Sequence, residues 1–332
     1  MRRYETRLGA AAIAAGLAWG IAAGWSSQVM AQSYPVKPIR LIVPFSAGGP
    51  VDVLGRGIGQ KFTASMGQQV LLDNRPGANT ILALDLVAKS PPDGYVILLA
   101  SGAFTTLASF NKTLPFDPLR DFTPVTMNAR IPGFLLVTHP SVPARSVKEL
   151  IAVAKANPDK LNYGSSGYGG VQHLAMSLFA LSAGTKMTHI VYKGAAPLSV
   201  DLVAGHVETA FMVPAGVLEY VRAGRLRALG FSGLKRWNKL PDVPTIDEAA
   251  IKHYEYYTWY GFWYPAGVPA AYVTKLHAET VKAVAAPDVL KRFDDLGFEG
   301  IASDKPADFA KFVQGDMLAM KKLAAQIGFV PQ

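Results

Sequence analysis

The stretch that decides the fold is Pro44-Phe45-Ser46-Ala47-Gly48-Gly49-Pro50-Val51-Asp52, a glycine turn between a strand and a helix. Before it, residues 39–43 form a short apolar run rich in β-branched side chains, which predicts a buried strand. After it, apolar residues recur at helical spacing as far as Phe62, and Pro50 suits the first turn of a helix. The two glycines permit a backbone conformation and a close approach that side chains would prevent.

This turn predicts an anion-binding site. The first N–H groups of a helix have no partner inside the helix, and the helix dipole adds partial positive charge there. A negatively charged group therefore binds readily at such an end. Asp52 falls near the third position of the helix, where we expect it to complement the dipole or to bond back to the turn. The candidate ligand-binding residues of this turn are Phe45, Ser46, Ala47, Gly48 and Gly49.

The same order of strand, glycine turn and helix recurs later in the chain. Residues 161–163 predict a short strand, Gly164-Ser165-Ser166-Gly167-Tyr168-Gly169-Gly170 forms the turn, and residues 171–182 predict an apolar helix. Two such anion-binding sites in separate halves of the chain predict that an anion is bound between two lobes. The candidates from this turn are Ser165, Ser166, Gly167, Tyr168 and Gly169.

Two further turns follow strands in the same way. Residues 95–99 predict a strand that small residues follow, and residues 189–196 again pass from a strand to a helix. Strands and helices thus alternate as in doubly wound α/β folds, where ligands meet the carboxyl ends of the strands. The candidates from the turn after residues 95–99 are Ser101 and Phe104.

The lobes are predicted from the course of the chain. An aromatic run between residues 254 and 264 predicts a strand that returns the chain to the first lobe. Helices are expected at about 270–285, 287–296 and 306–327. We therefore assign residues 32–132 and 256–332 to lobe 1, and residues 133–255 to lobe 2.

The first 31 residues have the pattern of a secretory signal peptide. Arg2, Arg3 and Arg7 give a basic start, residues 8–24 are apolar, and Val29 and Ala31 occupy the small-residue cleavage positions. A retained membrane anchor is the alternative, because 17 apolar residues nearly span a bilayer. The pattern favours removal and a mature protein in the periplasm that begins at Gln32.

Composition excludes several classes of function. The chain of 332 residues has no cysteine, so it has no disulfide, no thiolate nucleophile and no lipid-anchored cysteine. The formal charge of +9 comes from scattered basic residues, which does not indicate a nucleic-acid surface. None of the six histidines has metal-ligand spacing, and Gly55-x-Gly57-x-Gly59 lies inside the first predicted helix rather than before it. We expect neither a metal nor a cofactor.

The sequence resembles the solute-binding proteins of tripartite tricarboxylate transporters, also called the Bug family. The resemblance runs from about Tyr34 to the C-terminus. It implies a type II periplasmic binding fold, an α/β architecture whose two lobes hold a carboxylate in a cleft, largely through backbone N–H groups. The resemblance also implies that Tyr192, Gly194 and Ala195 close the site. The motifs that carry it are residues 34–52, Asn74-Arg-Pro-Gly-Ala78, Pro92-Asp-Gly-Tyr95, Asp121-Phe-Thr-Pro-Val125, Tyr163-Gly-Ser-Ser-Gly167, His173-Leu174, Tyr192-Lys-Gly-Ala-Ala-Pro197, Leu240-Pro-Asp-Val-Pro-Thr245 and Trp259-Tyr-Gly261.

We interpret the chain as a monomeric, non-enzymatic periplasmic protein that captures a small organic carboxylate for membrane permease subunits. No lysine or arginine lies in the two main turns, which favours a mono- or dicarboxylate over citrate. Aromatic residues in or beside the turns allow an aromatic acid, unless those rings are core. These residues are Phe45, Phe104, Tyr168, Tyr192 and Trp259. Two alternatives are a ligand sensor that docks on a receptor ectodomain, and a secreted hydrolase that uses Ser165 or Ser166 with His173.

Overall fold

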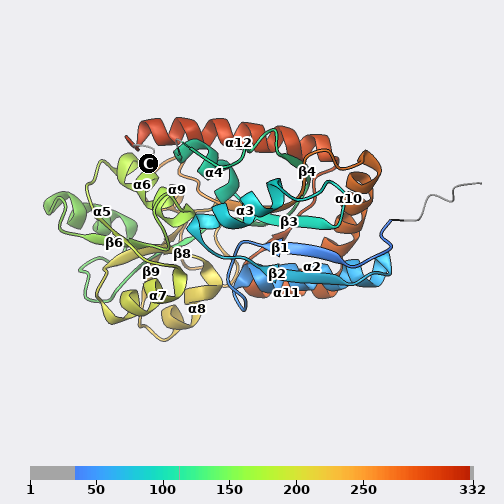
Figure 1. Ribbon diagram of the computed structural model, residues 1–332. Helices are drawn as coiled ribbons and strands as arrows, with labels where there is room; N and C mark the ends of the chain where they lie inside the picture. The colour runs from blue at the N-terminus through green and yellow to red at the C-terminus, as the bar shows by residue number, and fades with distance from the viewer. Residues whose placement is uncertain (1–33, 112, 330–332) are drawn as a thin grey trace, which may run out of the picture. The chain divides into compact units, whose positions relative to one another are not determined.

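The computed structural model describes residues 34–111 and 113–329. The predicted signal peptide lies outside the described residues. From Lys37 onward the chain forms one unit, and the description concerns that unit. Strands and helices alternate along it and build two separate sheets (Figure 1). The predicted α/β class is therefore confirmed.

The first sheet has six strands in the order β11-β4-β10-β3-β1-β2. β1 runs parallel to β2 and to β3, whereas β10 runs antiparallel to β3 and to β4. The bounds are β1 (Ile39–Val43), β2 (Val70–Asn74), β3 (Val96–Ser101), β4 (Phe122–Ile131), β10 (Thr258–Pro265) and β11 (Glu299–Gly300).

The aromatic run returns to this first sheet, as predicted, since β10 lies between β3 and β4. All eight of its residues are buried: Phe262 packs against Phe62, and Trp259 and Trp263 pack against Phe309. Gly261 has a packing role here: a Cβ atom at this position would collide with the ring of Phe309. The strand therefore needs glycine where the C-terminal helix crosses it.

The second sheet has five strands in the order β7-β6-β8-β5-β9. β6 runs parallel to β7 and β8, and β5 runs antiparallel to β8 and β9. The bounds are β5 (Leu135–Thr138), β6 (Asn162–Ser165), β7 (Thr188–Val191), β8 (Thr209–Met212) and β9 (Arg227–Phe231).

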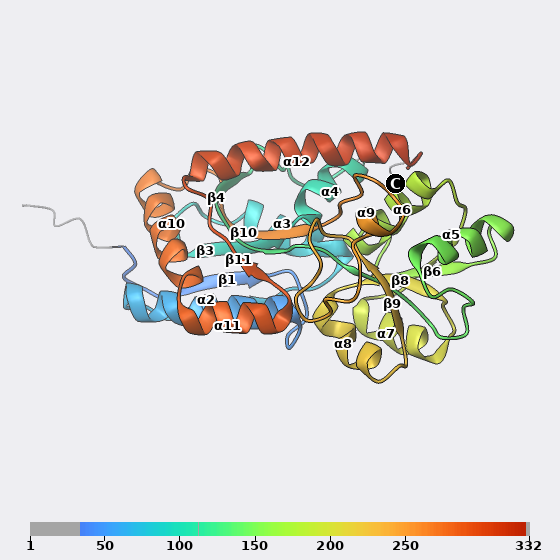
Figure 2. The ribbon, with the colours of Figure 1, turned by 180° about the vertical axis from the view of Figure 1, so that it is seen from behind.

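Helices flank both sheets (Figures 1 and 2). The helix of the opening stretch begins at Pro50 as predicted, and Ser146 caps α5 by accepting a hydrogen bond from the Glu149 N–H. The bounds are α2 (Pro50–Met66), α3 (Ile81–Ala88), α4 (Ala103–Phe110), α5 (Val147–Ala156), α6 (Val171–Ala183), α7 (Ala195–Ala204), α8 (Pro214–Arg222), α9 (Ile246–Ala249), α10 (Ala270–Val284), α11 (Pro287–Leu296) and α12 (Pro306–Gln326).

The C-terminal helix α12 contributes to the cores of both sheets. Phe309 and Val313 pack with the first sheet. Leu323 and Ala324 lie in a second core cluster, which is built mainly from β5, β6, β8, α5 and α6. Figures 1 and 2 both show α12 lying along the top of the molecule across the two groups of elements. One helix thus ties the two cores together.

Some boundaries differ from the expected ones. β3 begins and ends later than residues 95–99, and it reaches Ser101 because Tyr260 of β10 pairs with that residue. A 3-10 turn, η1 (Ala78–Thr80), precedes α3, and its residues all have positive φ. Local patterns could not reveal either feature, because partner strands and tertiary contacts set them. In the described part of the chain, every helix is too short or too polar to cross a membrane.

Candidate functional site

The first turn links β1 to the N-terminus of α2. The Gly49 N–H donates to the Ser46 carbonyl oxygen at 3.4 Å, and Gly48 between them has φ +80°. This is a tight turn whose third residue has the left-handed conformation that glycine adopts without strain. Gly49 is the N-cap residue of α2, with φ −76° and ψ 167°. Ser46, Ala47 and Gly48 are exposed.

The Asp52 side chain holds this turn through hydrogen bonds. Its carboxylate is buried and accepts hydrogen bonds from the Gly48 N–H at 3.0 Å, Asn74 Nδ2 at 3.0 Å and Arg56 Nε at 2.9 Å. The expectation that Asp52 bonds back to the turn is confirmed. Burial opposes its ionisation, but the hydrogen bonds from Arg56, Gly48 and Asn74 outweigh burial and lower its pKa. A negative charge therefore lies directly beneath the first turn.

The second turn, between β6 and α6, has the same geometry. The Gly170 N–H donates to the Gly167 carbonyl oxygen at 3.2 Å, and Gly169 has φ +71°. Gly170 is the N-cap residue of α6, with φ −73° and ψ 166°, nearly the angles of Gly49. His173 takes the place of Asp52, since its Nδ1 accepts a hydrogen bond from the Gly169 N–H at 3.0 Å.

Each turn keeps some backbone donors available. Among residues 34–111 and 113–329, no hydrogen-bond partner is found for the N–H groups of Ser46, Ala47 or Tyr168. The first-turn N–H groups of α2 and α6 have no partner inside their helices. Other donors of the second turn are occupied, because the Ser166 N–H donates to Gln172 Oε1 at 3.0 Å. The arrangement can bind an anion through backbone dipoles alone.

A stack of rings supports the second turn. His173 and His189 lie parallel with ring centroids 3.9 Å apart, and Tyr163 stacks on His189 at 4.7 Å. Tyr168 and Phe329 extend the stack, with their ring centroids 5.0 Å apart. Burial, together with the charge of the neighbouring His189, lowers the pKa of His173 to about 3, and burial lowers the pKa of His189 to about 4. Both imidazoles are therefore neutral near pH 7.

The geometry argues against the serine hydrolase alternative. Ser165 is fully buried, so a substrate carbonyl cannot reach its hydroxyl. The hydroxyl donates to the Gly167 carbonyl oxygen and lies 2.7 Å from His189 Nε2. His173 Nδ1 is occupied by the Gly169 N–H rather than by a carboxylate that would orient a catalytic imidazole.

The turn after β7 lies beside the second turn. The Tyr192 N–H donates to the Ser165 carbonyl oxygen at 2.9 Å, and the Gly194 N–H donates to the Ser166 carbonyl oxygen at 3.1 Å. The Tyr192 hydroxyl donates to Asp201 at 2.9 Å. Burial and this contact raise the pKa of Tyr192 to about 12. Its hydroxyl is thus committed to α7, and Ala195 begins that helix.

Ser101 is the last residue of β3, the strand next to β1 in the sheet, and Phe104 lies in the first turn of α4. Ser101 Oγ accepts a hydrogen bond from the Ala103 N–H at 3.2 Å. The Phe104 ring is buried in the core, where it stacks on Trp263 with a centroid distance of 5.2 Å. Trp259 is also core, and its Nε1 donates to Asp316 at 3.1 Å. Two of the rings considered for an aromatic pocket wall therefore pack in the core of the first sheet.

The predicted residues fall into two groups. The turns after β1 and β3 lie at one edge of the first sheet, and the turns after β6 and β7 lie together in the second. Sequence reasoning missed Phe329, whose ring packs against Phe110 of α4 at 4.4 Å and against Tyr168 of the second turn. Because Phe329 is far from both partners in the sequence, no local pattern indicates these contacts. Within the described residues, no group of histidine and acidic side chains could hold a metal ion.

Comparison with known proteins identifies the family. Residues 54–329 match the model of the tripartite tricarboxylate transporter family receptor. A UPF0065 protein from the tcbD–tcbE intergenic region of Pseudomonas sp. strain P51 is 38% identical over 307 residues, which are 92% of this chain and 91% of that protein.

Two solved structures are similar along their whole length. R. palustris Rpa4515 with adipate is 33% identical, with a TM-score of 0.83 over 90% of this chain and 100% of that chain. The periplasmic binding protein BugD is 30% identical, with a TM-score of 0.81 and the same coverage. The family and the fold are those of solute-binding receptors rather than enzymes. The chain belongs to the tripartite tricarboxylate transporter receptor family of periplasmic binding proteins.

Proposed function

We propose that this protein captures a small mono- or dicarboxylate in the periplasm, with an aliphatic dicarboxylate as the first choice. The observation that carries the proposal is the pair of matching turns, Ser46–Gly49 and Gly167–Gly170, each at the N-terminus of a helix. Two such seats suit a molecule with a carboxylate at each end. The related Rpa4515 was solved with adipate, a diacid.

An aliphatic ligand fits the site better than an aromatic one. The rings of Phe104 and Trp259 are buried in the core and cannot line a pocket for a flat acid. Neither main turn contains a lysine or an arginine that could neutralise a third carboxylate. We therefore place C4–C6 diacids before benzoate-type acids, and both before citrate.

Calorimetric titration of the purified protein with these three groups of acids tests the ligand class. Submicromolar to micromolar binding of a C4–C6 diacid, with weaker binding of benzoate and citrate, is the expected result. Tight binding of citrate with no response to the other acids would refute the proposed class.

Glycine substitutions test whether the backbone holds the ligand. Gly167→Val adds a side chain in open space without positive φ, so it should block the ligand's approach and leave the fold intact. Gly48→Val does the same in the first turn but adds left-handed strain. Gly67→Val is the matched control, since Gly67 also has positive φ and open space but ends α2. Unchanged affinity in both turn variants would show that other loops bind the ligand.

We further propose that the lobes, residues 32–132 with 256–332 and residues 133–255, close around the ligand as a monomer. The membership of the strands supports this division, because β1–β4, β10 and β11 share one sheet and β5–β9 the other. Small-angle scattering should show a smaller radius of gyration with ligand at an unchanged monomer mass. An unchanged radius at saturation would contradict closure.

The closed form is proposed to deliver its ligand to membrane permease subunits after removal of residues 1–31. The family supports this role. Deletion of the gene should abolish uptake of the labelled ligand, and periplasmic protein should begin at Gln32 by intact mass. Normal uptake together with a lost transcriptional response to the ligand would favour the sensor alternative instead.

A further inference from the structure

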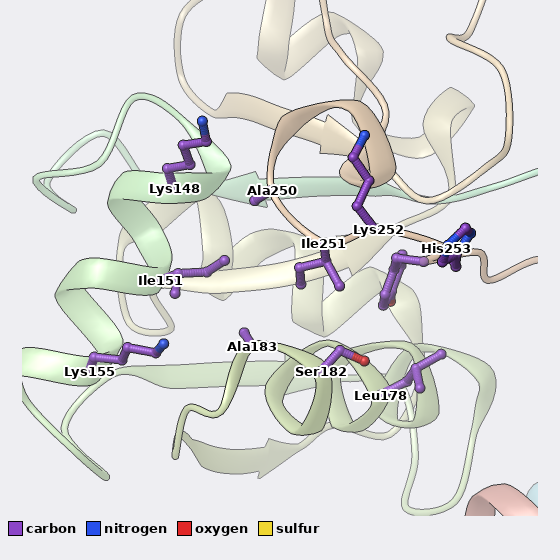
Figure 3. Close-up of a pocket in the computed structure, with 11 residues that line it drawn as sticks. Lys148, Ile151, Lys155, Leu178, Ser182, Ala183, Ala250, Ile251, Lys252 and His253 are labelled. Atoms are coloured by element: carbon purple, nitrogen blue, oxygen red, sulfur yellow. The ribbon is translucent and has the colours of Figure 1, made fainter.

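A cavity of about 550 Å³ lies away from the turns described above, between α5, the C-terminal half of α6 and the segment after α9 (Figure 3). None of its residues belongs to the proposed carboxylate site. Ser182 and Ala183 lie at the end of α6 opposite the second turn, about 20 Å away along a 13-residue helix. The residues that line the cavity are Lys148, Ile151, Lys155, Leu178, Ser182, Ala183, Ala250, Ile251, Lys252, His253 and Tyr254.

The rim of this cavity is cationic. Lys148 and Lys155 are separated by two helical turns and so lie on one face of α5, and Lys252 lies on the opposite side of the cavity (Figure 3). No aspartate or glutamate lines the cavity. Asp247 lies behind Lys252, at 3.7 Å from its Nζ. In the described ranges, no carboxylate lies within 4.0 Å of the Nζ of Lys148 or Lys155. The charge of these two lysines is thus available to a ligand.

The floor of the cavity is apolar. Ile151 lies between the two lysines of α5, and Ile251 occupies the centre of the cavity (Figure 3). Leu178 adds apolar surface from α6. Lysines that are only hydrated do not require an apolar surface between them. A ligand with an apolar part is stabilised when that part is buried on this surface.

The segment that closes the cavity is firmly held. The Tyr254 hydroxyl donates to the Ala175 carbonyl oxygen at 2.8 Å, and the Ile251 N–H donates to the Ile246 carbonyl oxygen at 3.0 Å. His253 has φ +62°, a conformation that its N–H maintains by donating to the Asp247 carboxylate. The cavity wall is therefore a preformed structure rather than a loose loop.

We propose that this cavity is a second binding site, for an amphiphilic anion. The acidic head group lies between the ammonium groups of Lys148, Lys155 and Lys252, and the apolar chain lies on Ile151, Leu178 and Ile251. The head group is a carboxylate or a phosphate monoester. Such an anion can be free in solution or can belong to a lipid at a membrane surface, and these sources share the same chemistry at the site.

Octyl phosphate is the probe, and calorimetry on the full mature protein is the readout. The charge-reversal pair Lys148→Glu/Lys155→Glu should weaken binding at least tenfold. The matched control pair Lys160→Glu/Lys186→Glu makes the same charge change on exposed lysines of the same lobe outside the cavity, and it should change binding less than twofold. Circular dichroism melting confirms folding, and the milder Lys155→Gln should weaken binding by a smaller factor if the reversal pair misfolds.

Two further probes separate the parts of the ligand. Inorganic phosphate and octanol should each bind at least tenfold more weakly than octyl phosphate, because each lacks one half of the amphiphile. Gly167→Val should leave octyl phosphate binding unchanged, which separates this site from the proposed carboxylate site. Failure of octyl phosphate to bind, an equal loss in the control pair, or loss in Gly167→Val would overturn the proposal.

Vesicles distinguish the two sources. If the protein floats with phosphatidylglycerol vesicles, and the charge-reversal pair weakens this flotation but its control does not, the site binds a lipid head group. Binding of octyl phosphate without flotation assigns it to a soluble amphiphile. Flotation that the two pairs weaken equally, without octyl phosphate binding, would overturn the site in both forms.

Discussion

Asp52 of α2 and His173 of α6 occupy the same position in two copies of one turn. Each accepts a hydrogen bond at 3.0 Å from the N–H of a glycine four residues earlier, Gly48 or Gly169. The two glycines have nearly the same positive φ. The charges differ, because Asp52 is an ionised carboxylate and His173 is a neutral imidazole. The second turn therefore opposes an anionic ligand less than the first.

The variant His173→Asp should place a carboxylate under the second turn as well. We expect the affinity for a dicarboxylate to fall about tenfold, or ~1.4 kcal/mol, because the new charge repels the ligand. His173→Asn is the matched control: it keeps an acceptor for the Gly169 N–H without a charge. Calorimetry at low and high salt measures the effect. An equal loss in both variants would mean that packing, and not charge, is responsible.

The histidine pair should make stability depend on pH in a defined window. The pKa of His173 is lowered to about 3 and that of His189 to about 4, below the usual value of 6.5. As pH falls below 6.5, these two imidazoles bind protons in the unfolded chain but not in the folded protein. The free energy of unfolding should therefore fall as pH decreases from about 6.5 to 4, by up to about 1.4 kcal/mol per pH unit for each histidine.

Urea denaturation at several pH values measures this slope. His173→Gln/His189→Gln should flatten the slope between pH 6.5 and 4, whatever its effect at pH 7. The exposed His206 provides the control variant His206→Gln, which should keep the slope of the parent protein. A slope that survives in the double variant would contradict the assignment to this pair.

Asp316 is expected to act as a hydrogen-bond acceptor more than as a charge. It accepts from Thr105 Oγ1 at 2.5 Å and from Trp259 Nε1 at 3.1 Å, and burial raises its pKa. Asp316→Leu should destabilise the protein by about 1–3 kcal/mol, since it leaves the buried indole N–H without an acceptor. Asp316→Asn keeps an acceptor oxygen and should be neutral or stabilising at pH 7. Thermal melting of both variants measures their stability. Equal destabilisation by the two variants would contradict the role of Asp316 as a hydrogen-bond acceptor.

Phe329→Ala should weaken ligand binding although this residue follows the last helix. Its ring supports Tyr168 and lies 3.8 Å from the position of a Cβ atom on Gly169. We expect a destabilisation of about 1–3 kcal/mol and at least a fivefold loss of affinity. Leu323→Ala is the control, because Leu323 fills the same core without stacking on Tyr168. If the control loses as much affinity, the effect of Phe329 is one of stability alone.

Local sequence pattern predicts the turns because their chemistry is local. Gly48 and Gly169 are required by the left-handed conformation, and Pro50 marks the start of its helix. The environments of the side chains were less predictable. The position of Phe104 beside a turn gives no sign that its ring stacks on Trp263 of a distant strand. Long-range packing decides such contacts, and one sequence does not reveal it.

The cavity lined by the α5 lysines shows the same limit. Its residues come from three segments that are separated by roughly 20 to 70 positions. Each lysine alone has the pattern of an ordinary solvated helix face. Only the fold brings Lys148, Lys155 and Lys252 around one apolar floor.

The shared helix α12 has a consequence for how the protein is made. Leu323 and Ala324 complete the core that β5, β6, α5 and α6 begin, and they lie within the last ten residues of the chain. The cores of both sheets are therefore complete only when this helix has packed against them. A chain that stops before α12 would leave apolar surface of both core clusters exposed, so we expect neither group of strands and helices to fold stably without the C-terminal helix.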